Sequence, residues 1–164
     1  NHILMKSLQE IEEKKDWMII HQAGEVDKVR LEEFYSKVGG EFKVEAFIKN
    51  IEEAYFKADL VISRAGAMTV SELIVMNKPS ILLPLPWATD NHQLLNANYL
   101  KKIGVAEVVL SEEKNINQLS NLLIKLSNDE ERRLSMHKSA KLALHPIGTE
   151  NILDHINESI KEKP

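Results

Sequence analysis

The sequence contains no cysteine. That absence excludes disulfide bonds, thiolate catalysis and cysteine-based zinc sites, and it is typical of proteins from a reducing compartment. No apolar run approaches the roughly 20 residues that a membrane-spanning helix needs, and no signal peptide is visible. We therefore expect a cytoplasmic protein.

An excess of positive charge is also lacking. The chain has 21 basic and 25 acidic residues, which give a formal net charge of −4. Such a balance argues against binding to nucleic acid and against electrostatic attachment to an anionic bilayer. Any anionic ligand must therefore be held by local groups.

The length and composition predict one globular domain over residues 1–164. Because 43% of the 164 residues are hydrophobic, the chain can bury a substantial core. It begins at Asn1 rather than at Met, and we expect a fragment or a processed product.

Short apolar runs alternate with segments of helical periodicity. Runs that are apolar on both faces and separated by helices pair in parallel, so the pattern predicts an α/β fold with a doubly wound parallel sheet. The predicted strands are 17–21, 42–47, 60–63, 80–86 and 106–109, and the predicted helices between them are 3–15, 25–38, 50–58, 69–77 and 91–103. After Ser111 only helices are expected, at 116–128, 129–144 and 148–163, and they form a helical C-terminal tail.

The stretch SRAGAMTVSE (63–72) follows a predicted buried strand and leads into a helix expected to start at Thr69. Thr69 and Glu72 have the spacing of a capping box, which gives a purely structural interpretation. The alternative is a site where backbone N–H groups at a helix start face an anion, with Gly66 allowing a phosphate to approach without a Cβ in the way. The stretch alone leaves both interpretations open.

A second stretch, PLPWATDNHQLLNA (84–97), follows the next predicted strand. Asp90 is a candidate helix cap, and the opening turns of the helix carry His92, Gln93 and Asn96. Amide side chains both donate and accept hydrogen bonds, which suits sugar hydroxyls. A solvated polar face is the competing interpretation of Gln93.

The continuous segment from Ala58 to Val109, together with HQAG (21–24) and VEAFI (44–48), resembles the nucleotide-sugar-binding half of the MurG family of bacterial glycosyltransferases. This family transfers N-acetylglucosamine from its UDP derivative to lipid I during peptidoglycan synthesis. The resemblance implies the Rossmann-like C-terminal half of a two-domain GT-B enzyme. The family's N-terminal acceptor domain and the glycine-rich turn that opens its C-terminal domain have no counterpart in this sequence, so a strand and a diphosphate-contacting loop are expected to be lacking.

The resemblance also implies roles for individual residues. The backbone at Ile48 matches the position that binds the uracil edge, and Phe47 lines that pocket. Glu72 matches the carboxylate that accepts the ribose hydroxyls, and Gln93 matches the contact to the N-acetylglucosamine ring. The helix start beside the diphosphate matches Ala67, Met68, Thr69 and Val70, and Ser71 is a further substrate-binding candidate. The secondary candidates are Phe47, Arg64, Gly66, His92 and Asn96.

The reaction implied by the resemblance is inverting, with UDP leaving as an acceptor hydroxyl attacks in line. By the same resemblance, the catalytic base, the lipid I acceptor site and the contact with the cytoplasmic face of the membrane are expected in the N-terminal domain. We assign no catalytic residue in this sequence. The histidines lack paired metal-ligand spacing and there is no DxD motif, so we expect neither metal nor cofactor.

Two alternatives are kept. One is a free-standing nucleotide-sugar-binding subunit that needs a separate acceptor-binding chain. The other is a GT-B-like sugar-nucleotide epimerase, which would need acid and base residues in the pocket, where the second stretch offers only His92.

Overall fold

A computed structural model describes residues 1–12, 16–85 and 91–144. Strands and helices alternate in it as the sequence predicts, and the helical tail after Ser111 is confirmed as far as Ala143. The predicted helix at 148–163 lies outside the described residues. The elements are α1 (His2–Gln9), β1 (Met18–Gln22), α2 (Lys28–Val38), β2 (Glu41–Glu45), α3 (Ile51–Lys57), β3 (Val61–Ser63), α4 (Ala67–Val75), β4 (Ser80–Leu82), α5 (His92–Lys102), β5 (Ala106–Val108), the 3₁₀ helix η3 (Glu113–Asn115), α6 (Ile116–Asn128) and α7 (Glu130–Ala143).

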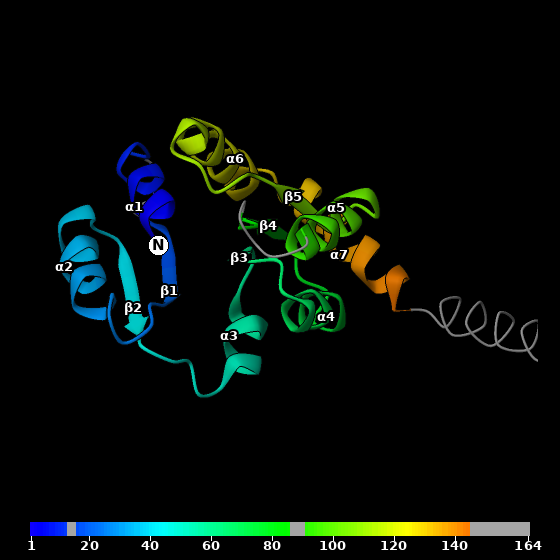
Figure 1. Cartoon of the computed structure of the whole chain (residues 1–164), viewed down its shortest axis with the longest axis horizontal. Coiled ribbons are helices and arrows are strands. Elements are labelled where there is room, and N and C mark those ends of the chain that lie inside the picture. Colours follow the sequence, from blue (N-terminus) through cyan, green and yellow to red (C-terminus); the bar gives the residue numbers. More distant parts are fainter. Residues whose placement is uncertain (13–15, 86–90, 145–164) are drawn as a thin grey trace, which may run out of the picture.

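All the described strands pair in parallel, which confirms the predicted class of fold, but they do not form one continuous sheet. β1 pairs with β2, and β4 pairs with β3 on one side and β5 on the other. Figure 1 shows α1 and α2 beside the first sheet, and α4, α5 and α7 gathered around the second. β1 and β3 therefore each have one edge without a strand partner among the described residues.

A large core joins the two sheets. Leu31 and Tyr35 of α2 pack in the same cluster as Ile81 of β4 and as Leu119 and Leu123 of α6. Helices α1 and α6 are in contact, and the buried hydroxyl of Ser120 donates to the backbone oxygen of Ser7 (3.1 Å). This packing holds the N-terminal half against the second sheet.

A second core lies on the other side of β4. Leu82 points into it together with Leu73 of α4, Leu100 of α5 and Ala140 of α7. Because Ile81 and Leu82 point to opposite faces and both are fully buried, β4 is apolar on both sides, as predicted. The same prediction is wrong for β1, where Met18 is 55% exposed.

Candidate functional site

The turn after β3 ends in an open helix start. Helix α4 begins at Ala67 with Gly66 as its N-cap, and no side chain caps it. The first bond of the helix runs from Val70 N–H to the Gly66 oxygen (2.9 Å), so the N–H groups of Ala67, Met68 and Thr69 come before any partner inside the helix. The predicted start at Thr69 is wrong, and the capping box is not formed, because Thr69 already lies inside the first turn.

Gly66 has a backbone conformation that any residue can adopt (φ −66°, ψ 152°). A Cβ built on it would meet only the Thr69 hydroxyl oxygen, at 4.0 Å. Neither backbone strain nor packing within the described protein therefore requires glycine here. Ala67 and Met68 are exposed, so the N–H groups at this helix start lie at the surface.

Two hydrogen bonds hold the turn in place. A guanidinium N–H of Arg64 donates to the backbone oxygen of Leu83 (2.7 Å), and the Asn96 amide donates to the backbone oxygen of Ala65 (3.0 Å). The Arg64 side chain is half-buried, and this burial lowers the pKa of its guanidinium. Arg64 and Asn96 thus join the turn to the segment after β4 and to α5, which gives both residues a structural role.

Glu72 lies one turn into α4 and is half-buried. Its Oε2 accepts a hydrogen bond from the hydroxyl of Tyr55 on α3 (2.9 Å). Ser71, the neighbouring candidate, is exposed, and its hydroxyl donates back to the Ala67 oxygen (3.1 Å). Of these two side chains, Glu72 is the one that a neighbouring element holds.

Gln93 stands near the start of α5, next to the exposed His92. Its side-chain oxygen accepts a hydrogen bond from the backbone N–H of Leu85 (3.1 Å), which secures the end of the segment after β4. The N-cap of α5 is Asn91, in a left-handed conformation (φ 54°) and without a side-chain capping bond. The predicted cap, Asp90, lies outside the described residues.

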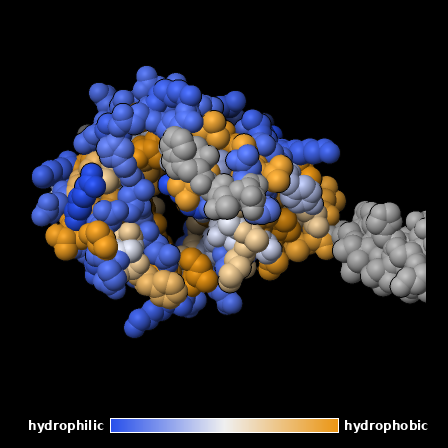
Figure 2. All heavy atoms as spheres, viewed as in Figure 1, coloured by the Kyte–Doolittle hydropathy of each residue, from blue (hydrophilic) through white to orange (hydrophobic). Residues whose placement is uncertain are grey.

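Ile48 and Phe47 belong to a different corner. They line a pocket of about 610 Å³ between the first sheet and α3, on the face that Figure 2 shows hollowed between the two halves of the molecule. The backbone N–H of Ile48, predicted to bind a nucleobase, is taken by the side-chain oxygen of Gln22 at the end of β1 (3.0 Å). Phe47 is 70% exposed.

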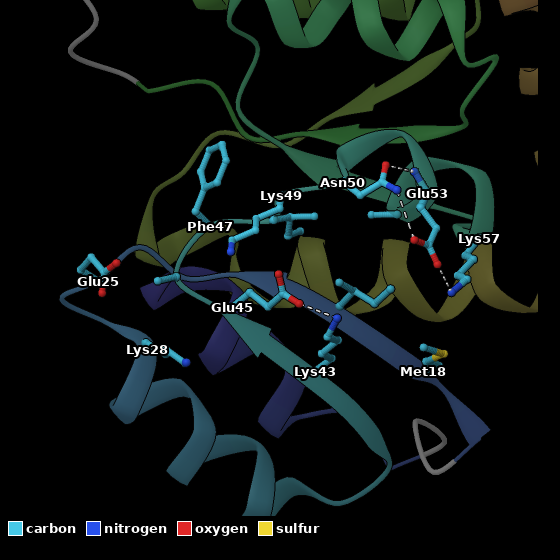
Figure 3. A pocket seen from close by; sticks show the side chains of 14 residues that line it. Met18, Glu25, Lys28, Lys43, Glu45, Phe47, Lys49, Asn50, Glu53 and Lys57 are labelled. Carbon is cyan, nitrogen blue, oxygen red and sulfur yellow. Dashed lines mark hydrogen bonds and ion pairs between the residues drawn. The ribbon is translucent and has the colours of Figure 1, made fainter.

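The same pocket carries its charge mostly as ion pairs. Lys43 pairs with Glu45 on β2, and Lys57 pairs with Glu53 on α3 (2.6 Å), as Figure 3 shows. The Asn50 side chain accepts from the Glu53 backbone N–H (3.3 Å) and so caps α3. Neither residues 67–72 nor Gln93 line this pocket.

The structure therefore groups the candidate residues into two sets. Arg64, Gly66, Gln93 and Asn96 meet where β3 and β4 end, with Glu72 following on α4. Phe47 and Ile48 lie at the end of β2. Sequence reasoning missed Gln22 and Tyr55, although Gln22 lies in the HQAG stretch and Tyr55 is the only tyrosine of its helix.

Parallel strands flanked by helices, with an open helix start at the carboxyl end of a strand, define a Rossmann-like domain of the GT-B glycosyltransferase type. The chain belongs to glycosyltransferase family 28: the model of the "Glycosyltransferase family 28 C-terminal domain" matches residues 1–152.

Two curated relatives carry one name, UDP-N-acetylglucosamine--N-acetylmuramyl-(pentapeptide) pyrophosphoryl-undecaprenol N-acetylglucosamine transferase. The chain is 38% identical over 154 residues to that of Pseudomonas putida (strain W619), covering 94% of this chain and 43% of the relative. It is 38% identical over 145 residues to that of Nitratidesulfovibrio vulgaris (strain DP4), covering 88% and 40%. The chain thus spans less than half the length of these relatives.

Solved structures support the same family and fold. The crystal structure of MurG from Acinetobacter baumannii matches with a TM-score of 0.75 and 29% identity, covering 94% of this chain and 46% of that one. A kitacinnamycin glycosyltransferase matches with a TM-score of 0.61 at 14% identity, which shows the fold alone. Among the described residues, no helix is both long enough and apolar enough to span a membrane.

Proposed function

We propose that the chain is the donor-binding half of an inverting N-acetylglucosaminyltransferase that uses UDP-N-acetylglucosamine and acts on lipid I. The names of the relatives and the family match support the substrate class. The observation that carries the proposal is the uncapped, exposed start of α4, with the carboxylate of Glu72 one turn further along the helix.

The start of α4 suits the diphosphate. Three N–H groups without a helical partner and the positive end of the helix dipole attract negative charge, and they stabilise it further as UDP departs. Gly66 adds no side chain between this helix start and a bound phosphate. Arg64 contributes less directly, because its guanidinium is engaged by the Leu83 oxygen.

The ribose, the sugar ring and the uracil of the donor substrate are assigned to the other candidate residues. Glu72 accepts the ribose hydroxyls, and the amide N–H groups of Gln93 reach the N-acetylglucosamine ring while its oxygen stays with Leu85. The backbone N–H of Ile48 donates to a carbonyl oxygen of the uracil in place of the Gln22 side-chain oxygen. Phe47 offers an exposed aromatic face beside the uracil. His92 is kept as a further candidate at the start of α5.

The whole protein's activity needs parts beyond these residues. We place the catalytic base, the lipid acceptor site and the membrane contact in an N-terminal domain like that of the family. A further parallel strand from the glycine-rich turn would pair at the open edges of β1 and β3. This chain alone is expected to bind the donor weakly and to show negligible transfer to lipid I.

Isothermal calorimetry with Glu72→Ala tests the proposal. We expect the variant to lose about 1–3 kcal/mol of binding free energy for both UDP and UDP-N-acetylglucosamine, because charge-assisted hydrogen bonds to the ribose are removed. Glu131→Ala, which removes an exposed carboxylate from the first turn of α7, is the matched control and should bind as the wild type does. Equal affinity of Glu72→Ala and the wild type would remove Glu72 from the site.

A further inference from the structure

Tyr55 is buried, whereas Glu72, to which its hydroxyl donates a hydrogen bond, is only half-buried. Its side chain is 7% exposed and packs in the second core with Leu73 and Ala65, although Tyr55 itself belongs to α3. The hydroxyl reaches Glu72 Oε2 at 2.9 Å, and a phenol facing a carboxylate must be the donor. Burial, and then the bond to Glu72, raise the pKa of Tyr55, so the hydroxyl keeps its proton over the physiological range.

The contact with Tyr55 uses only one of the two carboxylate oxygens of Glu72. Oε1 has no hydrogen-bond partner among the described residues, and no lysine or arginine described by the structure lies within 4.0 Å of either oxygen. An unheld glutamate would sample several rotamers, and a ligand that binds it would bear the cost of ordering it. A donor fixed in the core removes part of that cost before the ligand arrives.

We infer that Tyr55 is a positioning residue whose hydroxyl holds Oε2 of Glu72, so that the carboxylate presents its remaining acceptor sites to the two hydroxyls of a nucleotide ribose. The inference rests on the proposed function, because it requires Glu72 to be the ribose acceptor. A carboxylate has about four lone-pair directions, so the bond from Tyr55 leaves capacity for both ribose hydroxyls.

A purely structural role for Tyr55 makes a different prediction. If the bond to Glu72 served only to give the buried hydroxyl a hydrogen-bond partner, removing the hydroxyl would change the stability of the protein. It would also change the affinity for all uridine nucleotides by the same factor. Positioning through Glu72 requires instead that the effect depend on the ribose hydroxyls and on the presence of Glu72. A double-mutant cycle measures this dependence directly.

The experiment uses Tyr55→Phe, which keeps the ring and deletes the hydroxyl. We expect UDP to bind about 2- to 10-fold more weakly, the range that one net hydrogen bond gives. We also expect no change for 2′,3′-dideoxy-UDP and no further loss when Tyr55→Phe is combined with Glu72→Ala. Tyr99→Phe, on the exposed side of α5, is the matched control and should leave UDP binding unchanged.

Each outcome separates the inference from the proposed function. If Glu72→Ala weakens UDP binding and Tyr55→Phe does not, the inference is overturned and the proposed function stands. Equal losses for UDP and its dideoxy analogue, or a full additional loss in the Glu72→Ala background, also overturn it in favour of a structural role. If Glu72→Ala itself has no effect, the ribose assignment fails and the inference fails with it.

Discussion

The side-chain oxygen of Gln22 accepts a hydrogen bond from the backbone N–H of Ile48 at a distance of 3.0 Å. The two residues are 26 positions apart. Gln22 ends β1 and is in register with Glu45, the last residue of β2, and Ile48 follows three residues after Glu45. Gln22 is exposed, so its amide oxygen occupies a place that a nucleobase carbonyl could take from solvent. In the proposed complex the two oxygens compete for one N–H group.

This competition predicts that Gln22→Ala binds UDP more tightly than the wild type. The gain should be about 0.5–1.5 kcal/mol, because the bound base no longer has to displace an existing hydrogen bond. Gln22→Glu keeps an acceptor and adds charge, so it should bind UDP more weakly. Calorimetry on the three proteins checks both signs, and weaker binding by Gln22→Ala would show that Gln22 supports the base instead of competing with it.

Gly66→Ser is expected to separate binding from folding. Serine is a favoured N-cap and the position has room for a Cβ, so the free energy of unfolding should stay the same or rise. The new hydroxyl would bond the N–H groups at the start of α4 and block a phosphate, weakening UDP binding by about 1 kcal/mol. Uridine, which has no phosphate, serves as the control ligand. Unchanged UDP affinity would move the diphosphate away from this turn.

Two substitutions of Gln93 distinguish its two functions. Gln93→Glu keeps an oxygen for the Leu85 N–H but loses both amide donors, whereas Gln93→Ala loses everything. Both variants should bind UDP-N-acetylglucosamine about 0.5–1.5 kcal/mol more weakly and bind UDP as before. Only Gln93→Ala should lower the melting temperature. Parallel losses for the two ligands would contradict a sugar contact.

The stability of the chain should depend on pH through His21. Burial lowers the pKa of His21 from 6.5 to about 4, and its Nδ1 lies 2.8 Å from the Tyr35 hydroxyl. The unfolded chain therefore binds more protons between these values. The stability contributed by the neutral ring is complete above pH 6.5 and is lost as the pH falls toward 4.

Urea titrations at pH 6.5 and 4.5 measure this effect. The free energy of unfolding of the wild type should fall by about 2 kcal/mol more than that of His21→Gln over this interval. Identical slopes for His21→Gln and the wild type would show that His21 is protonated equally in the folded and unfolded states.

Local sequence patterns were sufficient for much of the fold. The alternation of apolar runs with helical segments predicts every described strand to within a few residues, because burial on both faces requires the continuous apolar run that β4 shows. The predicted start of α4 failed because a threonine followed by a glutamate satisfies the capping rule in sequence, whereas Gly66 ended the extended segment three residues earlier. Capping potential competes with backbone geometry, and the pattern alone does not rank them.

The features of the candidate site likewise fall into those that the sequence determined and those that only the tertiary structure decided. The sequence by itself determined which backbone segments follow the strands and which polar side chains they carry, because residue order fixes what lies at a strand end. Only the tertiary structure decided that Gln22 holds the Ile48 N–H, that Tyr55 holds Glu72 and that the described strands form two sheets. These are contacts and pairings between distant parts of the chain, and their geometry depends on how the helices pack against the sheets, which no short window of residues specifies.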